Sequence, residues 1–274
     1  MMKSLLRSLA FSLVAAFGIA MPAAASTASV DYTDLWYIPS ESGWGLNLIQ
    51  QNNVIFATMF VYGTDNTPRW YVASDLESSN GTNFSGALFK TTGSYFGAGW
   101  NPGQATATPA GSMSIVFNSP TSATLTYTAD GATVTKSVQR QTWKGENLSG
   151  NYLGGLTANT SQCTSGSNQP VLIFGTSMTV QHNTSSQAVT IILNAPSSSG
   201  STATCTFSGT YGQSGKLGTI SGNWSCVVGG TPSNSGIFTM SELQATIRGF
   251  NARFTGQDQF CQYTGNFGVV RDVQ

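Results

Sequence analysis

The sequence predicts an all-β protein, in which antiparallel meanders curl into barrel-like sheets of an avidin-like or lipocalin-like kind, in one or two units. Three observations lead to this fold class. Beyond residue 25, no segment keeps an apolar repeat of helical period over three turns. Short runs of Thr, Val, Ile and aromatic residues recur instead, separated by Gly, Asn-Gly or Asp-Gly. Third, a glycine pattern that is typical of bent strands repeats along the chain.

The first half of the chain begins with a predicted hairpin. Segments 44–51 and 54–62 run antiparallel around a polar turn, and a third strand follows at 69–75. Asp130-Gly131 is a strong signal for a further hairpin. Alternation at period two places the large apolar side chains of each segment on one face. In the first segment these are Trp44, Leu46 and Leu48, and in the second they are Val54, Phe56, Phe60 and Tyr62.

The glycine pattern consists of an apolar residue, Ser or Thr, Gly, any residue and a second apolar residue. Each copy puts a glycine between two large side chains on one face, so the strand can bend or a neighbouring ring can lie over its backbone. Repeated bends favour curled or closed sheets. Gly43 and Gly45, which flank Trp44, are interpreted in the same way, as a bend with a ring packed over it. The copies are FSGAL (84–88), LSGNY (148–152), FSGTY (207–211), ISGNW (220–224) and YTGNF (263–267).

The chain divides into a leader and two β units. Residues 1–25 combine a short basic head, an apolar run and a small-residue site before Ser26, which predicts a signal peptide and export to the periplasm or the medium. Composition changes near residue 145, because five of the six tryptophans precede it and all four cysteines follow it. The predicted units are therefore 26–145 and 146–274, with either separate cores or one shared core.

Charge and hydropathy exclude two classes of partner. Without Lys3 and Arg7 of the leader, 9 basic residues (11 minus 2) stand against 11 acidic residues, and no basic cluster occurs. A nucleic-acid partner would need clustered Lys and Arg to neutralise phosphates, so none is expected. No apolar segment after the leader approaches the about 20 residues that a membrane span needs. The mature protein is therefore expected to be exported and soluble.

The cysteines predict two disulfides, because an exported chain with an even number of cysteines normally pairs them. A zinc site is the alternative, but the sequence has no C-x-x-C pair and a single histidine. The four residues are Cys163, Cys205, Cys226 and Cys261.

One hairpin indicates how they pair. With Gly215-Lys216 at the turn, Cys205 faces Cys226 across the two strands. The same register sets Phe207 opposite Trp224, Gly209 opposite Gly222 and Tyr211 opposite Ile220. The preferred bridge is Cys205–Cys226, which leaves Cys163–Cys261, and the other two connectivities remain open.

Catalytic groups are few. His182 is the only imidazole, and no G-x-S-x-G motif supplies a serine for a Ser-His-Asp site, so His182 is interpreted as a surface-turn histidine. No metal site and no cofactor are predicted. Two carboxylates at a set separation would suffice for a glycoside hydrolase. Asp65 and Asp130 lie in turn sequences and are interpreted as turn formers, whereas Glu41, just before the Gly-Trp-Gly unit, is the candidate acid.

The crowded aromatic residues of the first half predict a binding site. Trp70 and Tyr71 are adjacent and must point to opposite faces of one strand, so at least one lies off the principal core. Trp44 begins a strand at the same end of the meander, at a rim where curled sheets bind ligands. The predicted ligand-binding residues are Trp44, Trp70, Tyr71, Gln50 and Glu41.

These patterns favour non-catalytic binding at the cell envelope or outside the cell. The predicted ligand is a glycan or a small apolar molecule, because exposed rings stack on flat apolar faces and amide side chains supply hydrogen bonds. One alternative is a carboxylate-based polysaccharide hydrolase. The other is a surface structural protein without a small ligand.

Several motifs resemble those of a known group. SESGWGLNLIQQ (40–51), FATMFVYGTDNTPRWYVAS (56–74), FSGALFKTTG (84–93) and TYTADGATVTKSVQRQTW (126–143) resemble a large group of uncharacterised exported proteobacterial proteins. Their recurring pattern is S-G-W-G, a Q-rich turn, an aromatic strand ending in Y-x-x-x-G, then P-x-W-Y. The segment GTISGNWSC (218–226) is similar to their usual continuation. The resemblance implies export and a β fold, and it implies no reaction, cofactor, ligand or catalytic residue.

Overall fold

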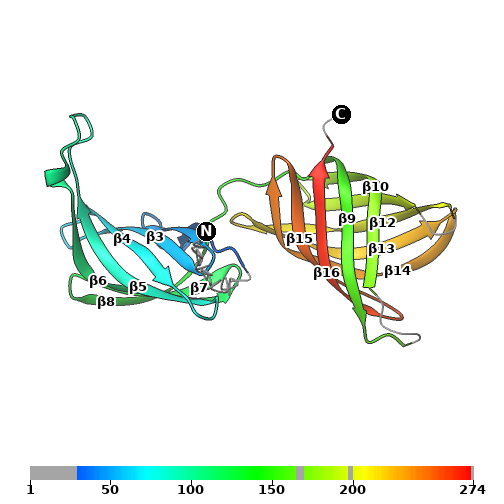
Figure 1. Ribbon diagram of the computed structural model, residues 1–274, viewed down its shortest axis with the longest axis horizontal. Helices are drawn as coiled ribbons and strands as arrows, with labels where there is room; N and C mark the ends of the chain where they lie inside the picture. The colour runs from blue at the N-terminus through cyan, green and yellow to red at the C-terminus, as the bar shows by residue number, and fades with distance from the viewer. Residues whose placement is uncertain (1–29, 165–169, 197–199, 273–274) are drawn as a thin grey trace, which may run out of the picture.

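The computed structural model describes residues 30–164, 170–196 and 200–272, and nearly all of its regular structure is β-strand. The strands form two closed antiparallel barrels of eight strands each, side by side along the long axis (Figure 1). The predicted all-β, barrel-like fold is therefore confirmed. Within the described ranges, no helix has the length and apolar character needed to cross a membrane. The predicted signal peptide lies outside the described residues.

The first barrel is a simple meander in which each strand pairs with the next. A single turn of 3-10 helix, η1 (Pro102–Gln104), interrupts the connection between its fifth and sixth strands. The strands are β1 (Asp34–Tyr37), β2 (Gly45–Gln51), β3 (Val54–Tyr62), β4 (Pro68–Glu77), β5 (Asn83–Thr92), β6 (Thr106–Ser119), β7 (Ser122–Ala129) and β8 (Ala132–Arg140).

The second barrel repeats this topology. Residues 141–149 connect the two barrels, and the boundary expected between residues 145 and 146 falls in this segment. The strands are β9 (Gly150–Ser161), β10 (Pro170–Asn183), β11 (Ala188–Pro196), β12 (Thr202–Ser214), β13 (Leu217–Val228), β14 (Thr231–Thr246), β15 (Gly249–Asp258) and β16 (Gln262–Arg271).

Each barrel closes where its first and last strands meet, with an arginine over an aromatic ring. In the first barrel, the Arg140 guanidinium lies 5.1 Å from the centre of the Trp36 ring. In the second, the Arg271 guanidinium lies 5.0 Å from the centre of the Tyr152 ring. Both rings also donate a hydrogen bond to the carbonyl four residues earlier, at 3.0 Å for Trp36 Nε1 and 2.8 Å for the Tyr152 hydroxyl.

The two seams differ in length, so closure of the first barrel depends more on the side chain of its arginine, Arg140. Strands β9 and β16 pair through ten residue pairs, whereas β1 and β8 pair only at Trp36–Arg140 and Tyr37–Gln139. Arg140 adds side-chain bonds to this short seam, with 3.0 Å to the Asp34 carboxylate and 2.6 Å to the Pro120 carbonyl oxygen. The seam of the first barrel therefore depends on a buried ion pair rather than on backbone pairing alone.

Each barrel has its own hydrophobic core, so the shared core left open by the sequence is not formed. In the first barrel, side chains at alternate positions of neighbouring strands point inward and are fully buried, so they fill the interior. Leu46 and Leu48 share one face as predicted, and that face is the inner one. On β3 the inner face carries the smaller or unbranched side chains, and Phe56, Phe60 and Tyr62 face outward. The inward residues of these two strands are Leu46, Leu48, Ile55, Ala57 and Met59.

The repeated glycines let neighbouring strands approach closely. Gly209 and Gly222 are directly paired across β12 and β13. A Cβ atom added to Gly222 would lie 2.0 Å from the Ser208 carbonyl oxygen, so no other residue fits without moving the backbone. At this pair the glycines allow close approach of two backbones, whereas the sequence predicts a bend or a ring lying over the strand.

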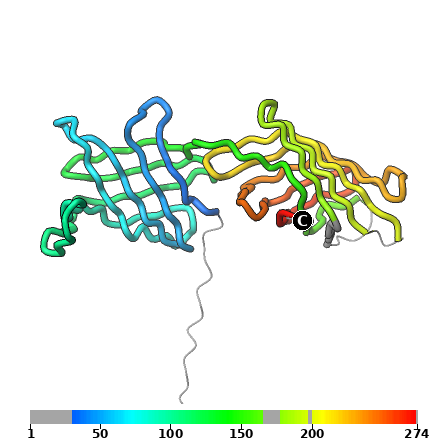
Figure 2. Tube along the Cα trace, turned by 90° about the horizontal axis from the view of Figure 1, so that it is seen from above, coloured from blue at the N-terminus to red at the C-terminus, as the bar shows by residue number. Residues whose placement is uncertain are grey.

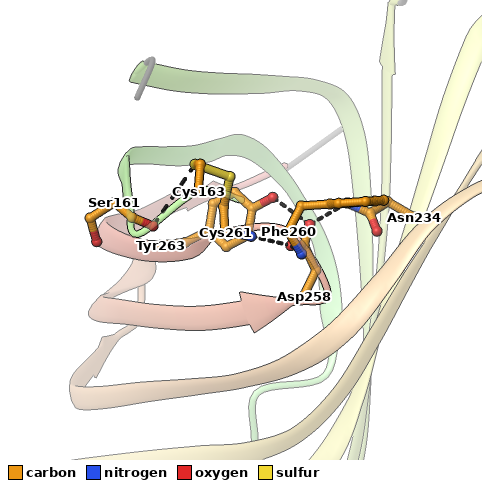
Figure 3. The surroundings of a disulfide bond; sticks show 7 residues. All are labelled: Ser161, Cys163, Asn234, Asp258, Phe260, Cys261 and Tyr263. Atoms are coloured by element: carbon orange, nitrogen blue, oxygen red, sulfur yellow. Dashed lines mark hydrogen bonds between the residues drawn. A yellow bond between two sulfur atoms is a disulfide. The ribbon is translucent and has the colours of Figure 1, made fainter. Parts of the chain in front are cut away.

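Both predicted disulfides are present, and the hairpin register is the predicted one. Strands β12 and β13 pair Cys205 with Cys226, and these two residues form a disulfide. The other bridge joins Cys163 to Cys261 at the far end of the second barrel's seam (Figure 3). Beside it, the Asp258 carboxylate accepts the backbone N–H of Cys261 at 2.7 Å and orders the turn (Figure 3). Two disulfides indicate that the protein folds in an oxidising environment.

A hairpin of the second barrel contacts the first barrel directly. The turn between β12 and β13 reaches across the junction, as both ribbon and tube views show (Figures 1 and 2). At its tip, the Lys216 backbone N–H donates to the Asp34 carboxylate at 2.8 Å, and the Lys216 ammonium pairs with Asp31. The Gly215 N–H donates to the Thr142 hydroxyl at 2.7 Å. These bonds fix the second barrel against the same end of the first barrel that Arg140 closes.

Candidate functional site

The most exposed aromatic surface on the strands of the first barrel is the outer face of β3 and β4. We call Phe56, Phe60, Tyr62 and Trp70 the aromatic wall. They lie outside because the inner positions of both strands are taken by buried residues, so period-two alternation turns these rings toward solvent. Trp70 and Tyr62 are each 59% exposed, although both belong to regular strands. Rings held on strands lose little freedom when a ligand stacks on them.

Two rings of the aromatic wall, Phe60 and Trp70, contact each other, and Phe60 and Tyr62 lie over the glycines around Trp44. Phe60 is paired with Trp70 across β3 and β4, and their ring centres lie 6.0 Å apart at 45°. A Cβ atom on Gly45 would approach the Phe60 ring to 3.1 Å, and one on Gly43 would approach the Tyr62 ring to 3.7 Å. The two glycines around Trp44 therefore leave room for two rings over the backbone, in agreement with the interpretation from sequence.

A network of polar groups lies in the turn between β3 and β4. The Asp65 carboxylate accepts a hydrogen bond from the Thr67 hydroxyl at 2.8 Å and pairs with the Arg69 guanidinium at 2.8 Å. Hydrogen bonds from Thr67 and then Arg69 lower the pKa of Asp65 to about 2. Asp65 is thus ionised at every physiological pH, and both it and Arg69, which shares the face of β4 with Tyr71, remain partly exposed.

Trp44 lies at the rim of the barrel, with its polar atom and one face of its ring occupied. Its Nε1–H donates to the Glu41 carboxylate at 2.9 Å, and the Lys136 ammonium pairs with the same carboxylate at 2.5 Å. The ammonium also lies 5.3 Å from the centre of the Trp44 ring. Hydrogen bonds from Lys136 and Trp44 lower the pKa of Glu41. This cluster joins β8 to the loop before β2.

A second cluster of the same kind lies at this rim. The Tyr71 hydroxyl donates to the Asp130 carboxylate at 2.7 Å, and the Lys90 ammonium pairs with that carboxylate at 2.6 Å. Burial, together with the bond to Asp130, raises the pKa of Tyr71 to about 12. Hydrogen bonds from Lys90 and Tyr71 lower the pKa of Asp130. Asp130 also occupies a turn with φ of 50°, as expected of a turn former.

The structure divides the predicted ligand-binding residues into three groups. Trp44 and Glu41 bond to each other at the rim, and Tyr71 lies buried at the same end. Trp70 points to the opposite face of its strand from Tyr71 and is exposed. Gln50 does not belong to this site, because β2 carries it to the other end of the barrel. There it accepts the Tyr32 N–H at 2.8 Å and donates to the Asn52 carbonyl at 2.7 Å.

Sequence reasoning missed two kinds of residue here. Alternation places Phe60 and Tyr62 on one side of β3, but nothing local in the sequence shows that this side faces solvent. Lys136 and Lys90 gave no signal, because they are 95 and 40 residues from the carboxylates they meet.

The interpretation of His182 as a surface-turn residue is wrong, because its side chain is 7% exposed. Its Nδ1 accepts the Leu148 N–H at 3.3 Å, and its ring meets the edge of Tyr211 at 5.0 Å. Burial lowers its pKa, so the ring is a neutral packing element of the second barrel. Across the described residues, no group of three or more His, Cys, Asp or Glu side chains is arranged to hold a metal ion.

Comparisons with known proteins give little further guidance. No family model matches the chain, and no curated protein sequence matches it. Among solved structures, the chain is similar to kievitone hydratase from Nectria haematococca, with 9% identity over 92% of this chain and 94% of that chain. The TM-score is 0.17, so this likeness supports no argument about fold or activity.

Proposed function

We propose that this is an exported, non-catalytic binding protein that holds a glycan against the aromatic wall of its first barrel. The observation that carries the proposal is Trp70, which is 59% exposed on a regular strand and supported from one side by Phe60. A tryptophan in a monomeric core would be covered, and the neighbouring Tyr71 is indeed buried. A flat, rigid and exposed ring is the surface on which the apolar face of a sugar stacks.

A glycan fits this surface better than a small apolar molecule. The interior of the first barrel is filled by its own core, with Leu46, Met59 and Leu88 all fully buried. A small apolar ligand needs a concave site that covers most of its surface. The aromatic wall is instead an open outer face, and the exposed rings of Trp70 and Tyr62 suit the apolar face of a sugar.

The alternative of a carboxylate hydrolase loses support at this end of the barrel. A glycoside hydrolase needs one carboxyl group whose pKa is raised so that it is protonated and can act as an acid. The pKa values of Glu41 and Asp130 are both lowered, by hydrogen bonds from Lys136 and Lys90 respectively. Both carboxylates are already neutralised by lysines, so their role is to fix the rim.

The site of action is proposed to be the periplasm or the medium. The disulfides are consistent with export, and the leader-like residues 1–25 support it from sequence. We further propose membership of the exported proteobacterial group with the S-G-W-G and P-x-W-Y motifs, on the resemblance of segments 40–51 and 56–74.

Affinity electrophoresis tests the proposal. Native gels cast with soluble xylan, galactomannan, hydroxyethyl cellulose or peptidoglycan fragments should retard the wild-type protein in at least one case. Trp70→Ala should weaken that binding by about tenfold, because a ring stack contributes about 0.5–1.5 kcal/mol beyond its buried area. Trp143→Ala is the matched control, since Trp143 is 77% exposed but lies in the connection between the barrels. A wild-type protein that no gel retards, or equal losses in both variants, would refute glycan binding at the aromatic wall.

A further inference from the structure

The connection between β5 and β6 projects beyond the rim of the first barrel. Both views show this hairpin leaving the barrel wall (Figures 1 and 2). Residues 91–109 are exposed at every position except Ser94, including the first part of β6. The extension therefore makes no contribution to the core, and its side chains are presented to whatever lies beyond the barrel.

The neck of this extension is held by a network of short-range bonds. The Ser94 hydroxyl donates to the Asn101 carbonyl at 2.9 Å and accepts the Asn101 N–H at 2.7 Å. The Thr92 hydroxyl donates to the Gln104 carbonyl at 2.9 Å. The tip, residues 95–100, is thereby closed as a small loop with its two ends bonded together.

This tip carries three large aromatic side chains that the fold leaves uncovered. Phe96 is 95% exposed, Trp100 70% and Tyr95 68%. The ring centres of Tyr95 and Phe96 lie 4.9 Å apart. Leaving these rings in water is unfavourable, because burying one large apolar side chain is worth about 1.5–3 kcal/mol. A partner that covers them would recover this free energy.

The charge pattern around the tip indicates the kind of partner. The sequence contains no Asp, Glu, Lys or Arg between Lys90 and Asp130, and these two flanking residues neutralise each other in an ion pair of 2.6 Å. The tip YFGAGW offers no polar side-chain atoms other than the Tyr95 hydroxyl and the Trp100 N–H. The tip therefore offers few hydrogen-bonding groups to the hydroxyls of a glycan or to the polar side chains of a protein. Tyr and Trp with an apolar neighbour are instead the residues that occupy the boundary between lipid headgroups and acyl chains.

We propose that the tip of the β5–β6 extension (Tyr95, Phe96 and Trp100) inserts into the interfacial region of a lipid bilayer and anchors the protein to a membrane surface. Phe96 enters the acyl boundary, and Tyr95 and Trp100 lie at headgroup level with their polar atoms toward water. Attachment depends on apolar burial and not on charge, because the nearest charges are paired. It therefore tolerates high salt and requires no anionic lipid.

Vesicle sedimentation tests this inference with phosphatidylcholine vesicles as the probe. The wild-type protein should sediment with the vesicles equally in 0.1 and 0.5 M NaCl. The double variant Phe96→Ser/Trp100→Ser should partition at least about a hundredfold less, since each of the two buried rings contributes at least about tenfold. Trp143→Ser, which removes an equally exposed tryptophan elsewhere, should partition like wild type. Trp70→Ala should also sediment normally, which separates this surface from the glycan site.

Insertion of the tip into the bilayer can be measured separately by quenching of tryptophan fluorescence. Brominated phosphatidylcholine should quench part of the wild-type tryptophan emission, and Trp100→Phe should bind the vesicles but lose that quenching. The inference is overturned if the wild-type protein does not sediment with phosphatidylcholine. It is also overturned if binding appears only with anionic phosphatidylglycerol and disappears at high salt, or if the double variant binds as well as wild type.

Discussion

Replacement of Arg140 by methionine should destabilise the first barrel more than any change at a surface ion pair. The Arg140 side chain is 0% exposed and its partner Asp34 is 7% exposed. Removing one member of a buried pair leaves an uncompensated charge and costs about 3–5 kcal/mol. Asp34 keeps two backbone donors, the N–H groups of Leu35 at 3.0 Å and Lys216 at 2.8 Å, so we expect the lower end, about 3 kcal/mol.

Urea unfolding followed by tryptophan fluorescence measures this loss. Five of the six tryptophans precede residue 145, and Trp36 lies directly under the Arg140 guanidinium, so the signal reports mainly the first barrel. A slope of about 1–3 kcal/mol per M urea converts the loss into a midpoint lowered by about 1–3 M. The matched control is Arg69→Met, which breaks an exposed pair with Asp65 and should cost at most about 1 kcal/mol.

A double variant separates the buried charge from the other contacts of Arg140. Asp34→Asn/Arg140→Met leaves no uncompensated carboxylate, and asparagine can still accept the Lys216 N–H. It should therefore be more stable than Arg140→Met alone. If Arg140→Met shifts the midpoint no more than Arg69→Met does, the seam of the first barrel does not depend on the ion pair and our reasoning is wrong.

Two further predictions concern the second barrel. In the chain-entropy model, the 98-residue separation of Cys163 and Cys261 makes their bridge worth roughly 1.4 kcal/mol more than the 21-residue Cys205–Cys226 bridge. Replacing each cysteine pair by serines and comparing the melting temperatures tests which bridge stabilises more. Equal decreases in melting temperature would contradict this prediction. Burial lowers the pKa of His182, so wild-type stability should fall as pH drops below about 6.5. In the His182→Asn variant, the urea midpoints at pH 7.5 and pH 5 should lie closer together than in the wild type. If the difference between the two midpoints is the same as in the wild type, His182 does not cause the loss of stability at low pH.

Several features follow from the sequence alone, because local rules determine them. The register of β12 on β13 is fixed by a two-residue turn at Gly215-Lys216 and by the two-residue repeat of a strand. Once that register is known, Cys205 and Cys226 must face each other, and the remaining bridge follows. The all-β class follows for the same reason, since turn residues and alternation act within a few positions of the chain.

Tertiary structure decided the surroundings of the candidate site. Glu41 meets Lys136 only because β1 to β8 close into a ring, and no pattern in sequence links residues 95 apart. Gln50 lies at the wrong end of the barrel for a role beside Trp44, because β2 runs the length of the wall between them.

The tertiary structure also decided which face of β3 is exposed to solvent. Both faces of this strand are apolar, so alternation separates two sets of side chains without showing which one is inside. The closed eight-stranded barrel decides, since its interior has space only for side chains that fill it without overlap. Ile55, Ala57 and Met59 occupy that space, and Phe60 and Tyr62 are left on the outer wall, where the fold leaves them partly open to solvent.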